Sequence, residues 1–133
     1  MTESTQGQST QVFYPSFRYH DARAAIDWLV EALGFEVAMV VDGEDRAVAH
    51  AELRLGSGMI MLGSESISAD RWGSHAGQAW VYVAVEDADA LYGRAKAAGA
   101  EVAMEPTDTD HGSRDFAIRD PEGNLWNFGT YRP

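Results

Sequence analysis

The chain has 133 residues, no cysteine and a formal net charge of −11, from 10 basic and 21 acidic side chains. This length fits one structural domain, and the missing cysteines exclude disulfides, thiolate nucleophiles and thiolate metal sites. The acidic balance argues against nucleic acid as a partner; it would attract a cationic small molecule, although solubility alone also explains it. No apolar run reaches the ~18 residues of a membrane span, so we expect a cytoplasmic protein with no membrane partner.

Residues 1–11 lack the basic and apolar regions of a signal peptide and are expected to form a flexible polar tail. The pattern after them predicts a strand, a helix and three more strands. The helix begins at an Asp21 N-cap and ends at Gly34, with an apolar stripe of Ile26, Leu29, Val30 and Leu33. The strands are predicted at 12–19, 36–41, 47–55 and 59–62. Pro15 marks the first of them as irregular or as an edge strand.

Residues 65–77 form a polar linker or lid, in which Trp72 is either a buried anchor or a flap over a ligand. The same order of elements then restarts. A strand at 78–85 precedes a helix from Asp87 to Gly99, followed by a strand at 101–105. The chain closes on a β-hairpin over 113–130, which turns at Asp-Pro-Glu-Gly-Asn, residues 120–124.

The two halves repeat one another. Gly34-Phe35-Glu36-Val37-Ala38-Met39 matches Gly99-Ala100-Glu101-Val102-Ala103-Met104 at an offset of 99 − 34 = 65. Leu62-Gly63-Ser64 matches Phe128-Gly129-Thr130 at 128 − 62 = 66. Each half therefore reads as a βαβββ module, over 12–64 and 78–133. Neither module could bury its sheet alone, so the sequence predicts an α+β fold in which two modules pair about a pseudo-twofold axis.

Paired βαβββ modules, together with Arg-Asp-Pro-Glu-Gly-Asn-Leu-Trp-Asn-Phe at 119–128, resemble the vicinal oxygen chelate superfamily, also called the glyoxalase/bleomycin-resistance/dioxygenase superfamily. The resemblance covers Val12 to Tyr131. The turn at 120–124 of this chain and its strand Ala79-Trp80-Val81-Tyr82-Val83 look most like the corresponding segments of bleomycin-resistance-type binding proteins. The resemblance implies curved mixed sheets around a ligand cavity. It also implies a homodimer, because many members complete their cavities across two chains.

In the metalloenzymes of this family, four inward-facing His, Gln or Glu side chains hold a divalent metal. Carried over by motif, the four positions are Tyr14, Met61, Trp80 and Asn127. The repeat supports the assignment, since 80 − 14 and 127 − 61 both equal 66. These side chains are poor ligands or none for such a metal. We therefore expect no glyoxalase-type metal centre, and no other cofactor.

The replacements suggest a different ligand. Trp80, Tyr14 and Met61 would line the cavity with flat, polarizable surface, Asn127 would add a donor and an acceptor, and Tyr82 shares the face of Trp80. This composition suits a planar or aromatic molecule. The same side chains could instead simply fill the interior of the sheet.

Several other polar residues could have either a functional role or an ordinary surface role. Arg18 shares the parity of Tyr14 and could meet an anionic group, or lie on the surface. His50 and Glu52 could form an acid–base pair or half of an unorthodox metal site, or a solvated strand face. Arg114 and Asp115 could rim the pocket or pair with neighbours. The other three histidines, His20, His75 and His111, are expected on the surface.

The leading hypothesis is a metal-free protein that binds a small planar or aromatic molecule, such as a cationic drug or toxin that it sequesters in antibiotic resistance. The alternative is an enzyme, a glyoxalase-type lyase, isomerase or dioxygenase with a non-standard metal site or none. Whether the chain is catalytic stays open at this point.

Overall fold

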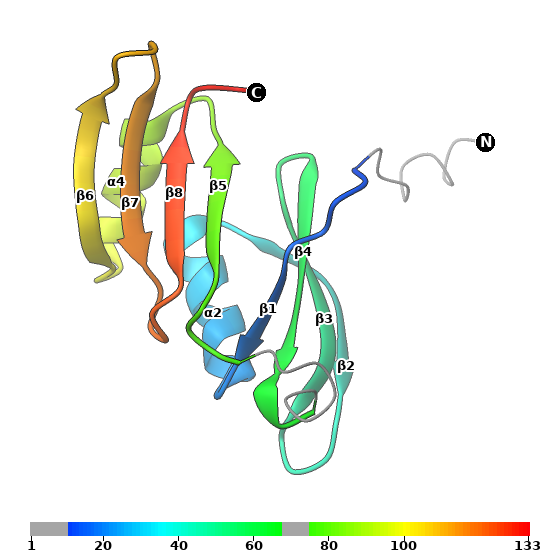
Figure 1. The fold of residues 1–133 in the computed structure, drawn as a ribbon. Helices are drawn as coiled ribbons and strands as arrows, with labels where there is room; N and C mark the ends of the chain where they lie inside the picture. Colours follow the sequence, from blue (N-terminus) through cyan, green and yellow to red (C-terminus); the bar gives the residue numbers. More distant parts are fainter. Residues whose placement is uncertain (1–10, 68–74) are drawn as a thin grey trace.

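The computed structural model of the protein describes residues 11–67 and 75–133. The first half contains β1 (Ser16–Tyr19), α2 (Ala22–Leu33), β2 (Glu36–Asp42), β3 (Val48–Leu55) and β4 (Gly58–Ser64). The second half contains β5 (Trp80–Ala84), α4 (Ala88–Ala97), β6 (Glu101–Asp108), β7 (Arg114–Arg119) and β8 (Leu125–Gly129). The order is βαβββ twice, as the sequence predicts (Figure 1).

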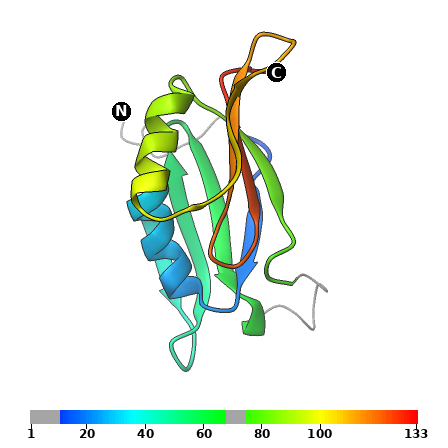
Figure 2. The same ribbon diagram turned by 90° about the vertical axis from the view of Figure 1, so that its left-hand side faces the viewer.

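Each half forms its own four-stranded mixed sheet. The strand orders are β1-β4-β3-β2 in the first sheet and β5-β8-β7-β6 in the second. Ser16 pairs with Met61 in the first sheet, and Tyr82 pairs with Asn127 in the second. The second pair repeats the first at an offset of 66 residues, since 82 − 16 and 127 − 61 both equal 66. Both helices lie on the same side of the molecule, behind the sheets in Figure 1 and to their left in Figure 2. Within the described residues, no helix has the length and apolar character needed to cross a membrane.

The first strand is shorter than predicted. It begins at Ser16, and the side chains of Val12 and Phe13 before it are 78% and 87% exposed. The carbonyl of Pro15 still accepts from the Met61 amide, 2.9 Å away, but proline has no N–H with which to extend a ladder. The side chain of Gln11 takes over the pairing, bonding both the amide and the carbonyl of Met59 at 2.7 Å.

Two residues lie on the opposite face from the one predicted. Val30 is exposed on α2, and the helix buries Ala22, Ala25 and Ala32 beside the predicted Ile26, Leu29 and Leu33. Strict alternation from Ala47 to Leu55 predicts that Val48 shares the face of His50, but Val48 is fully buried. The reason is a bulge in β3: His50 pairs with Val41 and Val48 with Asp42, so two steps on β3 match one on β2.

The two modules pair within one chain, which the sequence could not establish. Trp126 on β8 is fully buried and stacks on Phe17 of β1, with ring centroids 4.8 Å apart and planes 8° apart. Phe35, also from the first half, meets the same indole edge-on at 5.7 Å. One aromatic cluster therefore joins the two cores.

A buried carboxylate reinforces this junction. The Oδ2 atom of Asp120 accepts hydrogen bonds from the Tyr19 hydroxyl at 2.6 Å, the Asn124 amide at 3.0 Å and the Trp126 indole at 3.1 Å. Its Oδ1 atom accepts from the backbone amides of Glu122 and Asn124, both at 3.0 Å. Asp120 therefore shapes its own turn and ties that turn to β1 of the first half.

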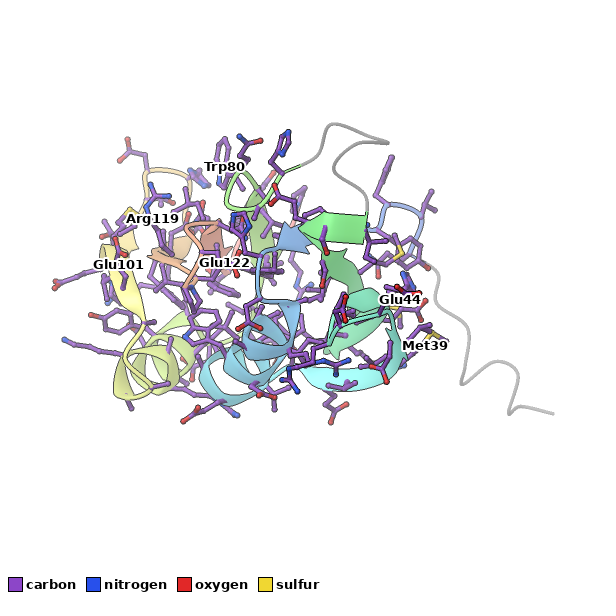
Figure 3. The ribbon with its side chains drawn as sticks, turned by 90° about the horizontal axis from the view of Figure 1, so that it is seen from below. Met39, Glu44, Trp80, Glu101, Arg119 and Glu122 are labelled. Atoms are coloured by element: carbon purple, nitrogen blue, oxygen red, sulfur yellow. The ribbon has the colours of Figure 1, made fainter. Side chains whose placement is uncertain are left out.

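The second half also holds both ends of α2. The Glu122 carboxylate accepts from the backbone amides of His20 and Asp21, at 2.7 and 2.8 Å, where the helix begins. At the other end Arg94 of α4 donates to the carbonyls of Glu31 and Val30, at 3.0 and 3.2 Å. Figure 3 shows Glu122 where the two halves meet. These contacts hold the segment that leads into α2 and the carbonyls of its last turn.

The Tyr19 hydroxyl makes stability sensitive to alkali. Burial, then the nearby Asp120 carboxylate, raise the pKa of Tyr19 far above its ordinary value of 10.0. In the unfolded chain Tyr19 ionises near pH 10, whereas in the fold it stays protonated. The raised pKa of Tyr19 therefore stabilises the fold fully below pH 10. Above pH 10 the free energy of unfolding falls by about 1.4 kcal/mol per pH unit. Urea denaturation between pH 8 and 11 measures the slope, which we expect to be shallower in Tyr19→Phe; equal slopes would contradict the assignment.

Candidate functional site

Each sheet has one face that the helices leave uncovered, called here the open face (Figure 2). In the first sheet the open face carries Arg18, His50, Glu52 and Met61. In the second sheet it carries Trp80, Tyr82, Asp115 and Asn127. The alternation of strand side chains places these residues there, because their neighbours Phe17, Leu62, Phe116 and Phe128 enter the core.

The open face of the second sheet presents aromatic surface. Trp80 stands at the start of β5 with 74% of its side chain exposed, and it projects on the side away from both helices (Figure 3). Tyr82, two residues on, donates its hydroxyl to the Tyr131 carbonyl at 2.6 Å. Asn127 donates its amide to the Phe116 carbonyl at 3.2 Å. These two polar groups are held in place, while the indole is open to a partner.

A carboxylate lies beside this aromatic surface. Asp115 is nearly buried and accepts a hydrogen bond from the Ser113 hydroxyl. A Cβ atom on Gly129 would collide with Asp115 and with Tyr82, whose hydroxyl would be 2.6 Å away. The absence of a side chain at Gly129 therefore makes room for both. Arg114 points elsewhere, since it pairs with Asp89 and Asp108, both at 3.2 Å, and these hydrogen bonds raise its pKa.

The open face of the first sheet is more polar. Nε2 of His50 lies 2.9 Å from Oε2 of Glu52, so the two side chains predicted as a pair do meet. Met61 lies across the strands from Glu52. Arg18 lies over Gly63, where a Cβ atom would collide with its guanidinium, and donates to the Ser16 hydroxyl at 3.3 Å.

The remaining histidines make local contacts. Nδ1 of His20 and Nδ1 of His75 each lie 2.9 Å from a carboxylate oxygen of Glu65. The hydrogen bonds from His75 and from the Ala76 amide lower the pKa of Glu65. His111 packs its ring edge-on to Tyr131 at 5.4 Å.

A cavity of about 590 Å³ opens between the two halves. Its apolar lining includes Phe35, Leu55, Met59, Ile60, Val81 and Val83. Tyr82 lines it as well, together with the charged side chains of Glu86 and Arg132. β5 is an edge strand of its sheet, so its unpaired backbone edge is available on this side.

The four family metal positions are divided between the two halves of the chain. Tyr14 precedes β1 and Met61 lies on β4, whereas Trp80 and Asn127 belong to the second sheet. None of the four lines the cavity. In residues 11–67 and 75–133, no three His, Asp or Glu side chains are grouped so as to hold a metal ion. The donor set at these positions does not fit the metal of the family's enzymes. Trp72 lies outside the described residues.

Sequence reasoning found the aromatic face but missed two features. The cavity between the halves depends on how the modules pack, and no motif signals it. The second is the position of Asp115 beside Tyr82. One feature of the sequence points to it: Gly63 repeats at Gly129, and both glycines leave space for a polar side chain on an open face.

The chain is similar to the sequences and solved structures of other proteins. An uncharacterised protein of Mycobacterium tuberculosis is 31% identical over 123 residues, which cover 86% of this chain and 71% of the relative. The crystal structure of TioX from Micromonospora sp. ML1 is 30% identical, with a TM-score of 0.77 over 92% of this chain and 99% of TioX.

A third comparison supports the fold alone. The structure of lactoylglutathione lyase from Agrobacterium tumefaciens is 21% identical, with a TM-score of 0.70 over 90% of this chain and 92% of that one. The family model matches residues 11–128, which is nearly the whole chain. The chain therefore belongs to the Glyoxalase/Bleomycin resistance protein/Dioxygenase superfamily.

Proposed function

We propose that this protein binds a small planar or aromatic molecule without the help of a metal. The observation that carries the proposal is the exposure of Trp80, an indole that projects from the open face instead of packing in the core. Large exposed aromatics on a concave or flat face are typical of binding surfaces. Tyr82 shares the face of Trp80 and also lines the cavity, so a ligand stacked on the indole could extend into it.

Sequestration of a drug or toxin is the role we propose for this binding. The acidic body of the protein, with a net charge of −11, would draw a cationic aromatic compound by long-range attraction. A homodimer is part of the proposal. The exposed apolar side chains Val37, Met39, Val40 and Val41 along β2 support it, because surface of this kind is often covered by a second copy.

An enzyme of the glyoxalase type is the second candidate. It is favoured by the His50–Glu52 pair at 2.9 Å, since an imidazole held by a carboxylate can move a proton. Elemental analysis of the purified protein separates the two candidates. A stoichiometric divalent metal that is lost in a His50→Ala variant would favour the enzyme and overturn metal-free binding.

The binding proposal is tested with three naphthalene compounds of equal shape: 2-naphthamide, 2-naphthoate and 2-naphthylmethylammonium. We expect at least one to bind by calorimetry and to raise the melting temperature. Trp80→Ala should weaken that affinity by about threefold to tenfold, because an aromatic pair contributes ~0.5–1.5 kcal/mol beyond burial. The control is Trp28→Phe, on the helix side, which should leave the affinity unchanged. Unaltered affinity in Trp80→Ala, or no binding by any compound, would contradict the proposal.

A further inference from the structure

The position of Arg18 is set by a glycine. Arg18 pairs with Gly63 across β1 and β4, and its guanidinium occupies the space that a Cβ atom on Gly63 would need. The guanidinium of Arg18 therefore lies over β4. Its neighbours Phe17 and Tyr19 are buried on the other side, so alternation along β1 places Arg18 on the open face.

In residues 11–67 and 75–133, no acidic side chain forms an ion pair with this guanidinium. In the part of the chain that the structure describes, its hydrogen bond goes to the Ser16 hydroxyl at 3.3 Å. By contrast, Arg23 and Arg114 both pair with aspartates. Burial lowers the pKa of Arg18. A guanidinium has five N–H donors, and the hydrogen bond to the Ser16 hydroxyl uses one of them.

The open face around Arg18 also carries an acidic and an apolar side chain. Glu52 is the acid on the same face, but its carboxylate is engaged by His50 at 2.9 Å. Met61 lies between Ser16 and Glu52 on neighbouring strands and offers the ligand a polarizable apolar surface.

We propose that Arg18 on the open face of the first sheet is an anion subsite, which binds the carboxylate or phosphate group of an aromatic ligand. This inference rests on the proposed binding of a small planar or aromatic molecule, and it replaces the cationic ligand proposed for sequestration with an anionic one. Arginine suits the task because its planar fork bonds both oxygens of such a group at once. The ligand class is then an aromatic acid, not the simple aromatic cation that the net charge favours.

The test compares binding of the same three naphthalene compounds, with 2-naphthyl phosphate added, by calorimetry. The wild-type protein should bind 2-naphthoate about tenfold more tightly than 2-naphthamide. Arg18→Gln should remove this preference and leave the affinity for 2-naphthamide unchanged. Gly63→Ala should also reduce the preference, because its Cβ displaces the guanidinium while the charge is kept. The phosphate arm shows which anion the subsite prefers.

The matched control is Arg54→Gln. Arg54 lies on the same strand as Glu52, two residues on, is exposed, and carries the same charge. The preference for 2-naphthoate should survive in this variant. Equal binding of 2-naphthoate and 2-naphthamide by the wild type would overturn the anion subsite and leave the proposed function standing. A preference that persists in Arg18→Gln would do the same. Failure of all four compounds to bind would overturn both.

Discussion

Replacing Asp120 with alanine is expected to lower the free energy of unfolding by about 3–5 kcal/mol. The carboxylate accepts five hydrogen bonds, three of them from the buried side chains of Tyr19, Asn124 and Trp126. Each buried donor left without an acceptor costs about 1–3 kcal/mol, and relaxation of the turn recovers part of the sum.

Urea denaturation followed by circular dichroism measures this loss. Asp120→Asn keeps the shape but presents an amide donor to other donors, so it should be nearly as damaging. The control is Asp110→Ala, an exposed aspartate in the β6–β7 loop, which should change stability by less than about 0.5 kcal/mol. A loss in Asp120→Ala as small as that control would show that the buried network does not hold the two halves together.

Trp126→Ala is expected to cost a similar amount, about 3–5 kcal/mol, for a different reason. The indole is fully buried, stacks on Phe17 and Phe128 and meets Phe35 edge-on, so its removal leaves a cavity at the junction of the modules. The loss of its hydrogen bond to Asp120 adds to the effect. Thermal and urea unfolding of the variant give the magnitude.

Trp80→Ala provides the matched comparison. It removes the same side chain from a position that is 74% exposed, so stability should stay within about 0.5 kcal/mol of the wild type. The two tryptophans should thus separate folding from binding: Trp126 affects stability, and Trp80 affects ligand affinity. Equal destabilisation by the two substitutions would contradict the assignment of Trp80 to the open face.

The parts of the fold that local rules determine were predictable. Asp21 and Asp87 each accept from the amide three residues on, as N-caps do, and Gly34 and Gly99 adopt positive φ at the helix ends. These signals are short-range, so the repeat could be read directly. The start of β1 and the face of Val48 were predicted wrongly, because Gln11 pairing with Met59 and the bulge in β3 both depend on neighbouring strands.

Of the candidate site, the sequence predicted only which side chains share a face, because that follows from the alternation of side chains along a strand. Trp80, Tyr82 and Asn127 share a face because they lie two residues apart or pair across strands. The Asp120 network is different, because Tyr19 lies 101 residues from its acceptor and no local pattern joins them. The turn that reads as a family motif is therefore partly a device for joining modules, which its sequence alone does not reveal.

Helix α2 belongs to the first half in sequence, but its two ends are fastened by the second. Glu122 bonds the amides of His20 and Asp21 just before the helix, and Arg94 bonds the carbonyls of Val30 and Glu31 in its last turn. We therefore expect fraying of the last turn, and movement of the segment that leads into the helix, to break contacts with the second half. Local opening of the first module is therefore coupled to the second, so the duplicated halves share one folding cooperativity even though each forms a separate sheet.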